Sequence, residues 1–320
     1  MRMNQKSKLC IAGVGAVGGL LAAMLGNNSE ISLALIARGS RAEAIREHGV
    51  VLHSQFYGEQ VCHPEIIAET GEELGIQDYV FVCVKNYSLD QIAETLRPCV
   101  DSHTVIVPVM NGVEPGSRLR ALFQDAVVCD GLVYTVSAAN PDYSVTQIGP
   151  YTYLYLGSQI QDERHRNAAE QLFQLLQSVG FDVRLSDDIQ SEIWQKYILN
   201  CAFNTVTARY LVTSGDIRKN ETMKNDAYAL LSEAYTVGVL EGVSLPEDLV
   251  EQKYRFMMEK QSENATSSMR RDLEAHRPTE MDAFLGTIVR KAAQHGVDVP
   301  VTMRFYKELL EMQSTHFPAI

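Results

Sequence analysis

Long apolar runs, paired cysteines and surplus positive charge are all missing from this 320-residue sequence. No apolar run approaches the ~18 residues that a membrane-spanning helix needs. The six cysteines are scattered, without a CxxC pair or a neighbouring histidine, which disfavours a disulfide framework and a zinc site. Because the opening stretch MRMNQKSK is polar, we expect no signal peptide. We expect a cytoplasmic protein with reduced thiols and no metal.

The shortage of positive charge limits the partners. The sequence has 28 Lys and Arg residues against 40 Asp and Glu residues, a net charge of −12. An acidic protein repels nucleic acid and anionic membranes, so we expect neither as a partner. An anionic ligand must therefore be held by a local cluster. The hydrophobic content of 46% is ordinary for a globular protein, and the length favours two domains.

The first half of the chain alternates short apolar runs with helix-like segments. The expected strands are 8–13, 31–38, 50–54, 78–84 and 104–109. Between them lie helical patterns such as AVGGLLAAMLGN, and SLDQ at Ser88 is typical of a capping box that opens a helix. This alternation predicts an α/β fold, with a doubly wound parallel sheet of the Rossmann type covered on both faces.

After residue 126 the pattern changes to period-two alternation around an Asn-Pro-Asp turn, which predicts antiparallel strands added to that sheet. A helix at about 162–179 and the strand FDVRLS follow. From Ser186 onward the periodicity is helical to about residue 313, with breaks near Gly215, Pro246, Pro278 and Pro300. We therefore expect an α/β domain over residues 1–185 and an all-helical domain over residues 186–320.

A glycine loop, GVGAVG, directly follows the first expected strand and opens the first helix. Gly13 would allow the turn, Gly15 would let the backbone approach a diphosphate, and Gly18 would let helix and strand pack closely. The diphosphate would then lie against open backbone amides, including those of Ala16 and Val17. The alternative is a tight turn with no ligand, because GxGxxG alone is a weak signal.

The end of the second expected strand indicates which dinucleotide binds. NAD sites place an acid about 20 residues after the glycines, but Arg38 stands there and no acid occurs before Glu43. An arginine suits the 2′-phosphate of NADP, and Arg41 is a second candidate for it. The alternative for Arg38 is an exposed arginine that ends a strand.

Two further residues follow expected strands at their carboxyl ends, where open α/β sheets bind ligands. Lys85 is a candidate second cation for the adenosine phosphate, or a solvated lysine. Asn111 lies where a nicotinamide would extend, although an Asn-Gly step after a buried strand is usually only a turn.

Lys196, Asn200 and Asn204 recur every four residues in the apolar helical segment IWQKYILNCAFNT. This spacing places them on one stripe about 12 Å long. Asparagine is a poor residue for a helix interior, and a buried lysine is costly unless it is paired. The stripe is either a solvated face or a substrate-facing wall, with Lys196 able to protonate an alkoxide and Tyr197 among the residues that hold the wall in place.

A second polar cluster, SSMRRDLEAHRPTEMD, predicts a short helix that ends before Pro278 and a new helix capped by Thr279. Taken singly, Ser267 and Ser268 could only open a helix, and Glu280 could only complement a helix N-terminus.

Together these residues resemble the ketopantoate reductase family (2-dehydropantoate 2-reductase) along nearly the whole chain. The resemblance rests on GVGAVG, the arginine after the second strand, VKNYSLDQ, the Asn-Gly step after the fifth strand, IWQKYILNCAFNTVTA and SSMRRDLEAHRPTEMDAFLGTIVRKAAQHGVDVP. It implies an NADPH-binding Rossmann domain, a helical domain, and a site in the cleft between them.

The resemblance also implies roles for single residues in the reduction of a 2-oxo acid. Lys196 would be the general acid, and Glu280 would orient the substrate hydroxyl or the lysine. Asn200, Asn204 and Ser268 would hold the substrate carboxylate and hydroxyl. Asn111 would lie near the nicotinamide and also serve the substrate side.

Two departures from the family pattern concern the substrate. Met110-Asn111-Gly112-Val113-Glu114 stands where Gln/His-Asn-Gly-x-Gly is common, and Pro278 stands where a basic residue is frequent. The expected activity is reduction of ketopantoate to (R)-pantoate for pantothenate and coenzyme A synthesis. The alternatives are a paralogous reductase of another 2-oxo acid and a non-catalytic NADP(H)-sensing protein. The acidic surface and the helical half permit a homodimer.

Overall fold

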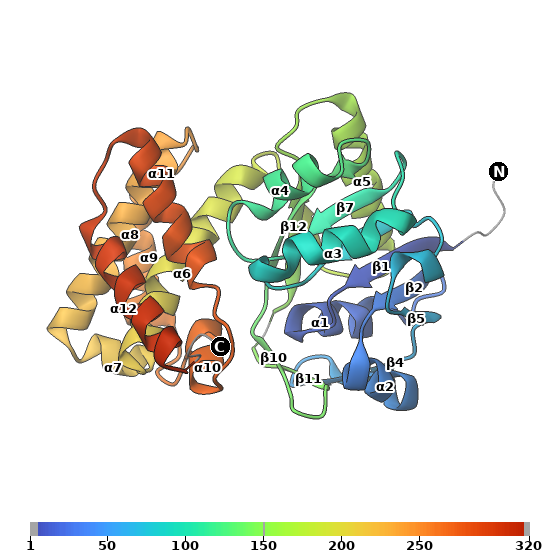
Figure 1. Ribbon diagram of the computed structural model, residues 1–320, viewed down its shortest axis with the longest axis horizontal. Coiled ribbons are helices and arrows are strands. Elements are labelled where there is room, and N and C mark those ends of the chain that lie inside the picture. Colours follow the sequence, from blue (N-terminus) through green and yellow to red (C-terminus); the bar gives the residue numbers. More distant parts are fainter. Residues whose placement is uncertain (1–5, 150, 317–320) are drawn as a thin grey trace. The chain divides into compact units, whose positions relative to one another are not determined.

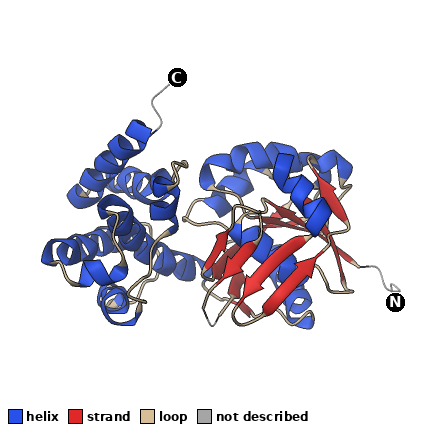
Figure 2. Cartoon of the chain, turned by 90° about the horizontal axis from the view of Figure 1, so that it is seen from below, coloured by secondary structure: helices blue, strands red, loops and turns tan. Residues whose placement is uncertain are grey.

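The chain divides into two compact units, Met1–Ile189 and Gln190–Ile320, in a computed structural model that describes residues 6–149 and 151–316 (Figure 1). Every strand of the described residues lies in the first unit, and the second unit is built from helices (Figure 2). The domain boundary expected at residue 185 lies just before this division.

A six-stranded parallel sheet in the order β5-β2-β1-β6-β7-β8 forms the centre of the first unit. These strands are β1 (Ser7–Ala12), β2 (Ile31–Ile36), β5 (Ile66–Ala68), β6 (Tyr79–Val82), β7 (Val105–Pro108) and β8 (Val127–Val128). The order runs outward in both directions from β1, as in a doubly wound sheet. The predicted Rossmann-type α/β fold is confirmed.

Both faces of this sheet are covered because neighbouring residues of a strand point to opposite sides. Leu9 and Ile11 of β1 pack with α1 (Ala16–Leu25) and α5 (Glu163–Ser178). Cys10 and Ala12 pack in a second cluster with α3 (Leu89–Leu96) and α4 (Pro115–Leu122). Burial on both sides explains why these strands are apolar almost throughout.

Two smaller sheets complete the first unit. One has the order β10-β11-β3-β4 and the other the order β13-β12-β9. Their strands are β3 (Val50–Ser54), β4 (Gly58–Cys62), β9 (Asp130–Tyr134), β10 (Ser137–Ala139), β11 (Val145–Gln147), β12 (Tyr153–Gly157) and β13 (Val183–Leu185). The antiparallel strands were predicted correctly, but their placement was wrong, because they pair in these small sheets and not with the six-stranded one. The alternation of residues fixes which face is buried, but it does not identify the partner strand.

The second unit is a helical assembly around α6 (Ile189–Tyr210) (Figure 1). Its other helices are α7 (Ser214–Arg218), α8 (Glu221–Leu240), α9 (Leu249–Arg255), α10 (Ser268–Glu274), α11 (Thr287–His295) and α12 (Pro300–His316). α9 continues into a π-helical turn, η4 (Phe256–Lys260), and a second π-helical turn, η5 (Asp282–Gly286), precedes α11. Within residues 6–149 and 151–316, no helix is long and apolar enough to cross a membrane.

Two predicted helix caps are wrong. Ser88 precedes α3, but its side chain makes no capping hydrogen bond. Residues 86–88 form a 3-10 turn, η2, so the helix is entered from a turn and not from an extended residue. The hydroxyl and the amide of Thr279 both donate to Gln313 Oε1 on α12, at 2.8 and 2.9 Å. Thr279 is thus held by another helix instead of capping its own.

Further short elements join the main ones in the first unit. They are α2 (Gly39–His48) and the 3-10 turns η1 (Gly71–Glu73) and η3 (Arg97–Cys99). All six cysteines are free thiols, as their spacing predicts.

Candidate functional site

Four groups of candidate residues follow four neighbouring parallel strands of the main sheet. The glycine loop follows β1, Arg38 follows β2, Lys85 follows β6 and Asn111 follows β7. Parallel strands end at the same edge of a sheet, so these segments share the carboxyl edge. In open α/β sheets this is the edge that binds ligands.

The three glycines of the loop differ in the constraint that excludes a side chain at each position. Gly13 has φ +96°, a conformation that L side chains rarely adopt. A Cβ atom on Gly18 would lie 2.0 Å from the carbonyl oxygen of Gly13. Gly15, the residue before α1, has φ −85°, and a Cβ atom there would meet no protein atom within 4 Å.

Packing and backbone conformation therefore explain Gly13 and Gly18 but leave Gly15 unexplained. Gly15 also has no side chain to cap α1, so the first-turn amides, including those of Ala16 and Val17, are open to a ligand. A bound diphosphate would account for both facts. The loop fits a dinucleotide.

The two arginines near the end of β2 have different surroundings. Arg38 is exposed, and its guanidinium donates to the hydroxyl of Thr95 at 2.8 Å and to the carbonyl of Glu69 at 3.3 Å. Arg41 is half-buried and donates to the carbonyl of Val14, inside the glycine loop, at 2.6 Å. Neither arginine forms an ion pair within the described part of the chain. Both cations are compatible with an adenosine phosphate.

Lys85 and Asn111 lie at the ends of β6 and β7, which are hydrogen-bonded neighbours. Both residues are half-buried. Asn86, beside Lys85, donates from its side chain to the carbonyl of Asn111 at 2.9 Å. Arg118 of α4 donates to the carbonyl of Asn86 at 3.3 Å and so supports the same turn. These contacts fix the backbone of Asn111 beside the segment that carries Lys85.

In the second unit, Lys196 lies on α6 and Glu280 lies two residues before η5. Burial lowers the pKa of Lys196 to about 8, and the negative charge of Glu280 partly opposes that shift. The Glu280 side chain is itself buried, with 5% of its surface exposed. A lysine in this state is protonated at neutral pH and gives up its proton more readily than an ordinary lysine. The pair suits general acid catalysis.

The stripe residues Asn200 and Asn204 are held differently. Asn204 is buried, and its Oδ1 accepts from the hydroxyl of Ser268 at 3.3 Å and from the amide of Met269 at 3.4 Å. Because Oδ1 is committed to the start of α10, the amide nitrogen is left to donate to a ligand. Asn200, half-buried between the other two, has no hydrogen-bond partner among the described residues. Thus the structure brings Asn204 and Ser268 together across 64 residues of sequence.

Ser267 opens a helix, which is the structural role considered for it from the sequence. It caps α10 by accepting from the amide of Arg270 at 3.1 Å, and it also hydrogen-bonds with Thr207 of α6 at 2.7 Å. Thr207 was not singled out in the sequence, since a threonine in a helix carries no signal of its partner. Together Asn204 and Thr207 tie one face of α6 to the start of α10.

Tyr197 holds the segment next to Glu280. Its hydroxyl donates to the carbonyl of Phe284 at 2.5 Å and lies 3.2 Å from that of Ala283. Its ring stacks on the ring of Phe284 and meets Trp194 edge-on. A π-helical turn leaves carbonyls without their usual helical partners, and such turns are frequent at functional sites. Tyr197 donates into η5 and so holds this turn against α6.

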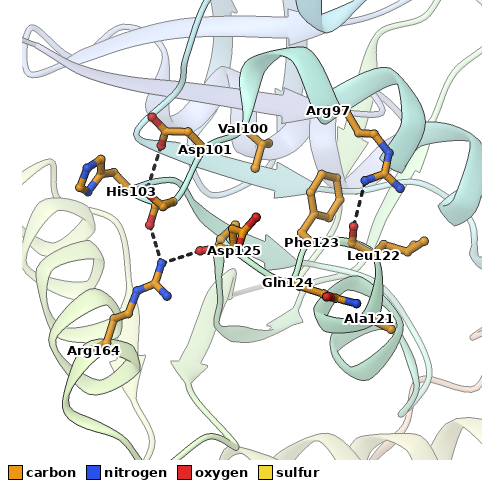
Figure 3. A pocket seen from close by; sticks show the side chains of 12 residues that line it. Arg97, Val100, Asp101, His103, Ala121, Leu122, Phe123, Gln124, Asp125 and Arg164 are labelled. Atoms are coloured by element: carbon orange, nitrogen blue, oxygen red, sulfur yellow. Dashed lines mark hydrogen bonds between the residues drawn. The ribbon is translucent and has the colours of Figure 1, made fainter.

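A large open depression lies elsewhere on the first unit. Its volume is about 1030 Å³, and its lining includes residues that precede β7 and β8, at the amino edge of the sheet (Figure 3). Arg97 donates to the carbonyl of Leu122, and Arg164 donates to those of Ser102 and Asp125. Figure 3 shows Arg164 between two backbone carbonyls and Arg97 beside the carbonyl of Leu122. The depression contains none of the candidate residues, so we assign it no role in catalysis.

Comparison with known proteins identifies the family. The family model described as "Ketopantoate reductase PanE/ApbA" matches residues 9–159, and its "C terminal" counterpart matches residues 188–313. The chain belongs to the ketopantoate reductase family. An uncharacterized oxidoreductase, YkpB, of Bacillus subtilis (strain 168) is 30% identical to this chain over 303 residues, which are 94% of this chain and 97% of the relative. A 2-dehydropantoate 2-reductase of Mesorhizobium japonicum is 30% identical over 302 residues, 88% of this chain and 90% of the relative.

Solved structures share the fold. A PanE/ApbA family ketopantoate reductase from Ralstonia eutropha JMP134 has a TM-score of 0.87 at 25% identity and covers 97% of this chain and 99% of its own. The ternary structure of D-mandelate dehydrogenase with NADH and anilino(oxo)acetate has a TM-score of 0.85 at 20% identity, with the same coverage. The ketopantoate reductase family thus contains this chain, and its fold extends to an enzyme named for another substrate.

Proposed function

We propose that this chain is an NADPH-dependent 2-dehydropantoate 2-reductase that converts ketopantoate to (R)-pantoate, a step toward pantothenate and coenzyme A. The observation that carries the proposal is Lys196, with its pKa lowered to about 8 beside Glu280, on the helix stripe that also presents Asn200 and Asn204. The 2-dehydropantoate 2-reductase name of several relatives supports the choice of substrate.

The first unit, expected as residues 1–185, holds the cofactor in this proposal. The glycine loop Gly13-Val14-Gly15-Ala16-Val17-Gly18 receives the diphosphate, and Arg38 and Lys85 serve the adenosine phosphate. Asn111 contacts the nicotinamide end of the cofactor. Bound NADPH supplies the hydride that adds to the C2 carbonyl carbon. The missing acid at the end of β2 favours NADPH over NADH, since a carboxylate there would repel a 2′-phosphate.

The second unit, expected as residues 186–320, supplies the proton and the substrate contacts. As the carbonyl becomes an alkoxide, the Nζ–H of Lys196 donates a hydrogen bond and then the proton, leaving a neutral amine. Glu280 keeps the lysine charged before that step. Asn200 and Asn204 donate to the carboxylate and hydroxyl of the substrate without adding a second charge. Ser268, whose proton is donated to Asn204, accepts a hydrogen bond from the substrate hydroxyl.

The test is NADPH oxidation, followed by absorbance, with ketopantoate and a panel of branched and unbranched 2-oxo acids. We expect the highest kcat/KM with ketopantoate and a clear preference for NADPH over NADH. A protein that turns over another 2-oxo acid but not ketopantoate would keep the reaction class and reject the substrate. A protein that binds NADPH but reduces none of them would reject catalysis in favour of NADP(H) sensing.

A second candidate is a reductase of another 2-oxo acid. Two residues favour it: Glu114, which adds a carboxylate directly after the Asn-Gly step, and Pro278, which removes a basic residue that is frequent in the family. The likeness in fold to an enzyme named D-mandelate dehydrogenase is compatible with this. The same panel of acids separates the two candidates. A homodimer and a cytoplasmic location stay predictions, and light scattering of the purified protein checks the former.

A further inference from the structure

Three arginines occupy α10 and the loop that follows it, and they differ in their partners. Arg270 forms an ion pair with Glu274 at 2.8 Å, and Arg277 forms one with Asp272 at 2.9 Å. Arg271 forms no ion pair within residues 6–149 and 151–316. Two of the three guanidinium groups are therefore neutralised by a neighbouring carboxylate, and the third is not.

Arg271 is half-buried and only weakly held. Burial lowers the pKa of its guanidinium from the ordinary value, while the charge of Asp272 opposes that shift and the charge of Arg277 adds to it. Nη1 donates to the carbonyl and to the hydroxyl of Thr266, both at 3.4 Å, which is near the upper limit for a hydrogen bond. Partial desolvation of a cation with such weak partners costs free energy, and an anionic ligand would offset that cost.

The position of Arg271 on α10 places it beside the candidate substrate contacts. It follows Ser268 by three residues, so the two side chains lie on the same side of the helix. Helical side chains incline toward the N-terminus of their helix, and the contacts of Arg271 with Thr266, which precedes α10, have this direction. The same end of α10 is held by Asn204, through the hydroxyl of Ser268 and the amide of Met269. Arg271 therefore lies next to the group formed by Asn204 and Ser268.

A 2-oxo acid brings a carboxylate to the second unit, where the proposed contacts leave its charge unbalanced. Asn200 and Asn204 donate without charge, and Lys196 donates to the carbonyl oxygen on the neighbouring carbon. Glu280 is negative and the whole chain has a net charge of −12, so the surroundings do not attract an anion. Moving a carboxylate out of water is costly unless a cation pairs with it. A further cation is therefore required near the carboxylate.

We propose that Arg271 is a specificity-determining residue that pairs with the carboxylate of the 2-oxo acid and so selects acids over neutral ketones of the same shape. The inference rests on the proposed function, because it concerns the substrate of that reaction. Both contacts with Thr266 use Nη1, and Nε and Nη2 have no hydrogen-bond partner among the described residues. The Nε–Nη2 edge of a guanidinium donates two parallel hydrogen bonds, which match the two oxygens of a carboxylate. This edge is available to the substrate.

The test compares a 2-oxo acid with its methyl ester, in which the carboxylate is masked. NADPH oxidation is followed at saturating NADPH for ketopantoate, or for whichever acid the wild type reduces, and for the corresponding ester. Arg271→Gln should lower kcat/KM for the acid roughly ten- to hundredfold, mainly through KM, because it removes hydrogen bonds to a charged group. The kcat/KM for the ester should change by less than about twofold. Arg271→Lys keeps the charge but loses the fork, and it should restore part of the loss.

Two further variants are controls. Arg255→Gln makes the same change at an exposed arginine of α9 and should alter neither value of kcat/KM. Arg277→Gln removes a positive charge from the same segment as Arg271, but that charge already pairs with Asp272, so the ratio of kcat/KM for acid and ester should change by less than about threefold. Thermal melting checks folding. If Arg271→Gln does not fold, Arg271→Lys takes its place, with a smaller loss for the acid and none for the ester.

The outcomes separate the inference from the proposed function. An unchanged kcat/KM for the acid in Arg271→Gln overturns the inference alone. An equal loss for acid and ester also overturns it, because Arg271 would then only support the fold. The same holds if Arg277→Gln causes an equal loss for the acid, since the effect would then come from charge in general.

A protein that reduces no 2-oxo acid contradicts the proposed function. Calorimetric binding of (R)-pantoate and its methyl ester to the NADP-bound protein then makes the same comparison without turnover. Tighter binding of pantoate that is lost in Arg271→Gln supports the inference, and equal binding of the two compounds by the wild type overturns it.

Discussion

The glycine loop of the first unit offers backbone amides to a ligand, whereas the stripe on α6 of the second unit offers an ammonium and two carboxamides. The loop acquires its shape within six residues, from Gly13 to Gly18, and from the strand and helix on either side. The stripe acquires its chemistry from distant residues: Ser268 orients Asn204, and Glu280 acts on Lys196. Local structure creates the first group, and tertiary packing creates the second.

Under the proposed function, this difference separates cofactor binding from catalysis. Backbone amides around a glycine can receive a diphosphate but cannot transfer a proton at neutral pH. A lysine can, provided that its surroundings lower its pKa, as burial does for Lys196. Substitutions in the glycine loop should therefore weaken cofactor binding, whereas substitution of Lys196 should lower turnover.

The largest effect is expected for Lys196→Ala. Loss of the general acid should lower kcat roughly 10²- to 10⁴-fold, while the dissociation constant of NADPH changes by less than about twofold. Stopped-flow or steady-state NADPH oxidation gives the first value, and fluorescence quenching gives the second. Lys219→Ala, at an exposed lysine of the same unit, is the control and should leave both unchanged. Full turnover by Lys196→Ala would remove the lysine from the mechanism.

Two glycine substitutions should separate folding from cofactor binding. Gly18→Ala forces a Cβ atom against the Gly13 carbonyl and should lower the free energy of unfolding by ~3 kcal/mol. Gly15→Ala meets no protein atom, so stability should be unchanged while NADPH binding weakens about tenfold or more. Urea unfolding and cofactor titration measure the two effects. Unchanged NADPH binding by Gly15→Ala would contradict the diphosphate position.

A smaller effect is expected at the substrate contacts. Asn204→Ala removes the amide that Ser268 and Met269 orient and should raise KM for the 2-oxo acid about tenfold. NADPH binding should not change, because the contact belongs to the second unit. Asn264→Ala, at an exposed asparagine, is the control. If Asn204→Ala weakens NADPH binding and KM equally, the division of roles between the groups is wrong.

Tyr197→Phe should have the smallest effect on activity. It removes a buried hydrogen bond to the carbonyl of Phe284 and should cost about 1–3 kcal/mol in the free energy of unfolding, with a severalfold fall in kcat. Tyr228→Phe removes an exposed hydrogen bond to Glu251 and serves as the control. If the stability of Tyr197→Phe equals that of the wild type, the support of η5 by this hydroxyl is refuted.

The same contrast explains what the sequence allowed us to predict. The alternation of apolar strands and helices, the glycine loop and the helical second unit are local patterns, and they predicted the parallel sheet with both faces covered. The partner of Asn204, the contact of Tyr197 with the π-helical turn after Glu280 and the hydrogen bond between Thr207 and Ser267 depend on contacts between distant segments. No local pattern encodes these contacts, and the same reason accounts for the wrong placement of the antiparallel strands and the wrong cap at Thr279.

The pH dependence of kcat for 2-oxo acid reduction, measured at saturating NADPH, tests the central claim most directly. The general acid must be protonated, and the pKa of Lys196 is lowered to about 8. We therefore expect kcat to be level below pH ~8 and to fall about tenfold per pH unit above it. Lys196→Ala should lack this fall in its residual activity. A wild-type kcat that stays level to pH ~10 would contradict the proposed role of Lys196 as the proton donor.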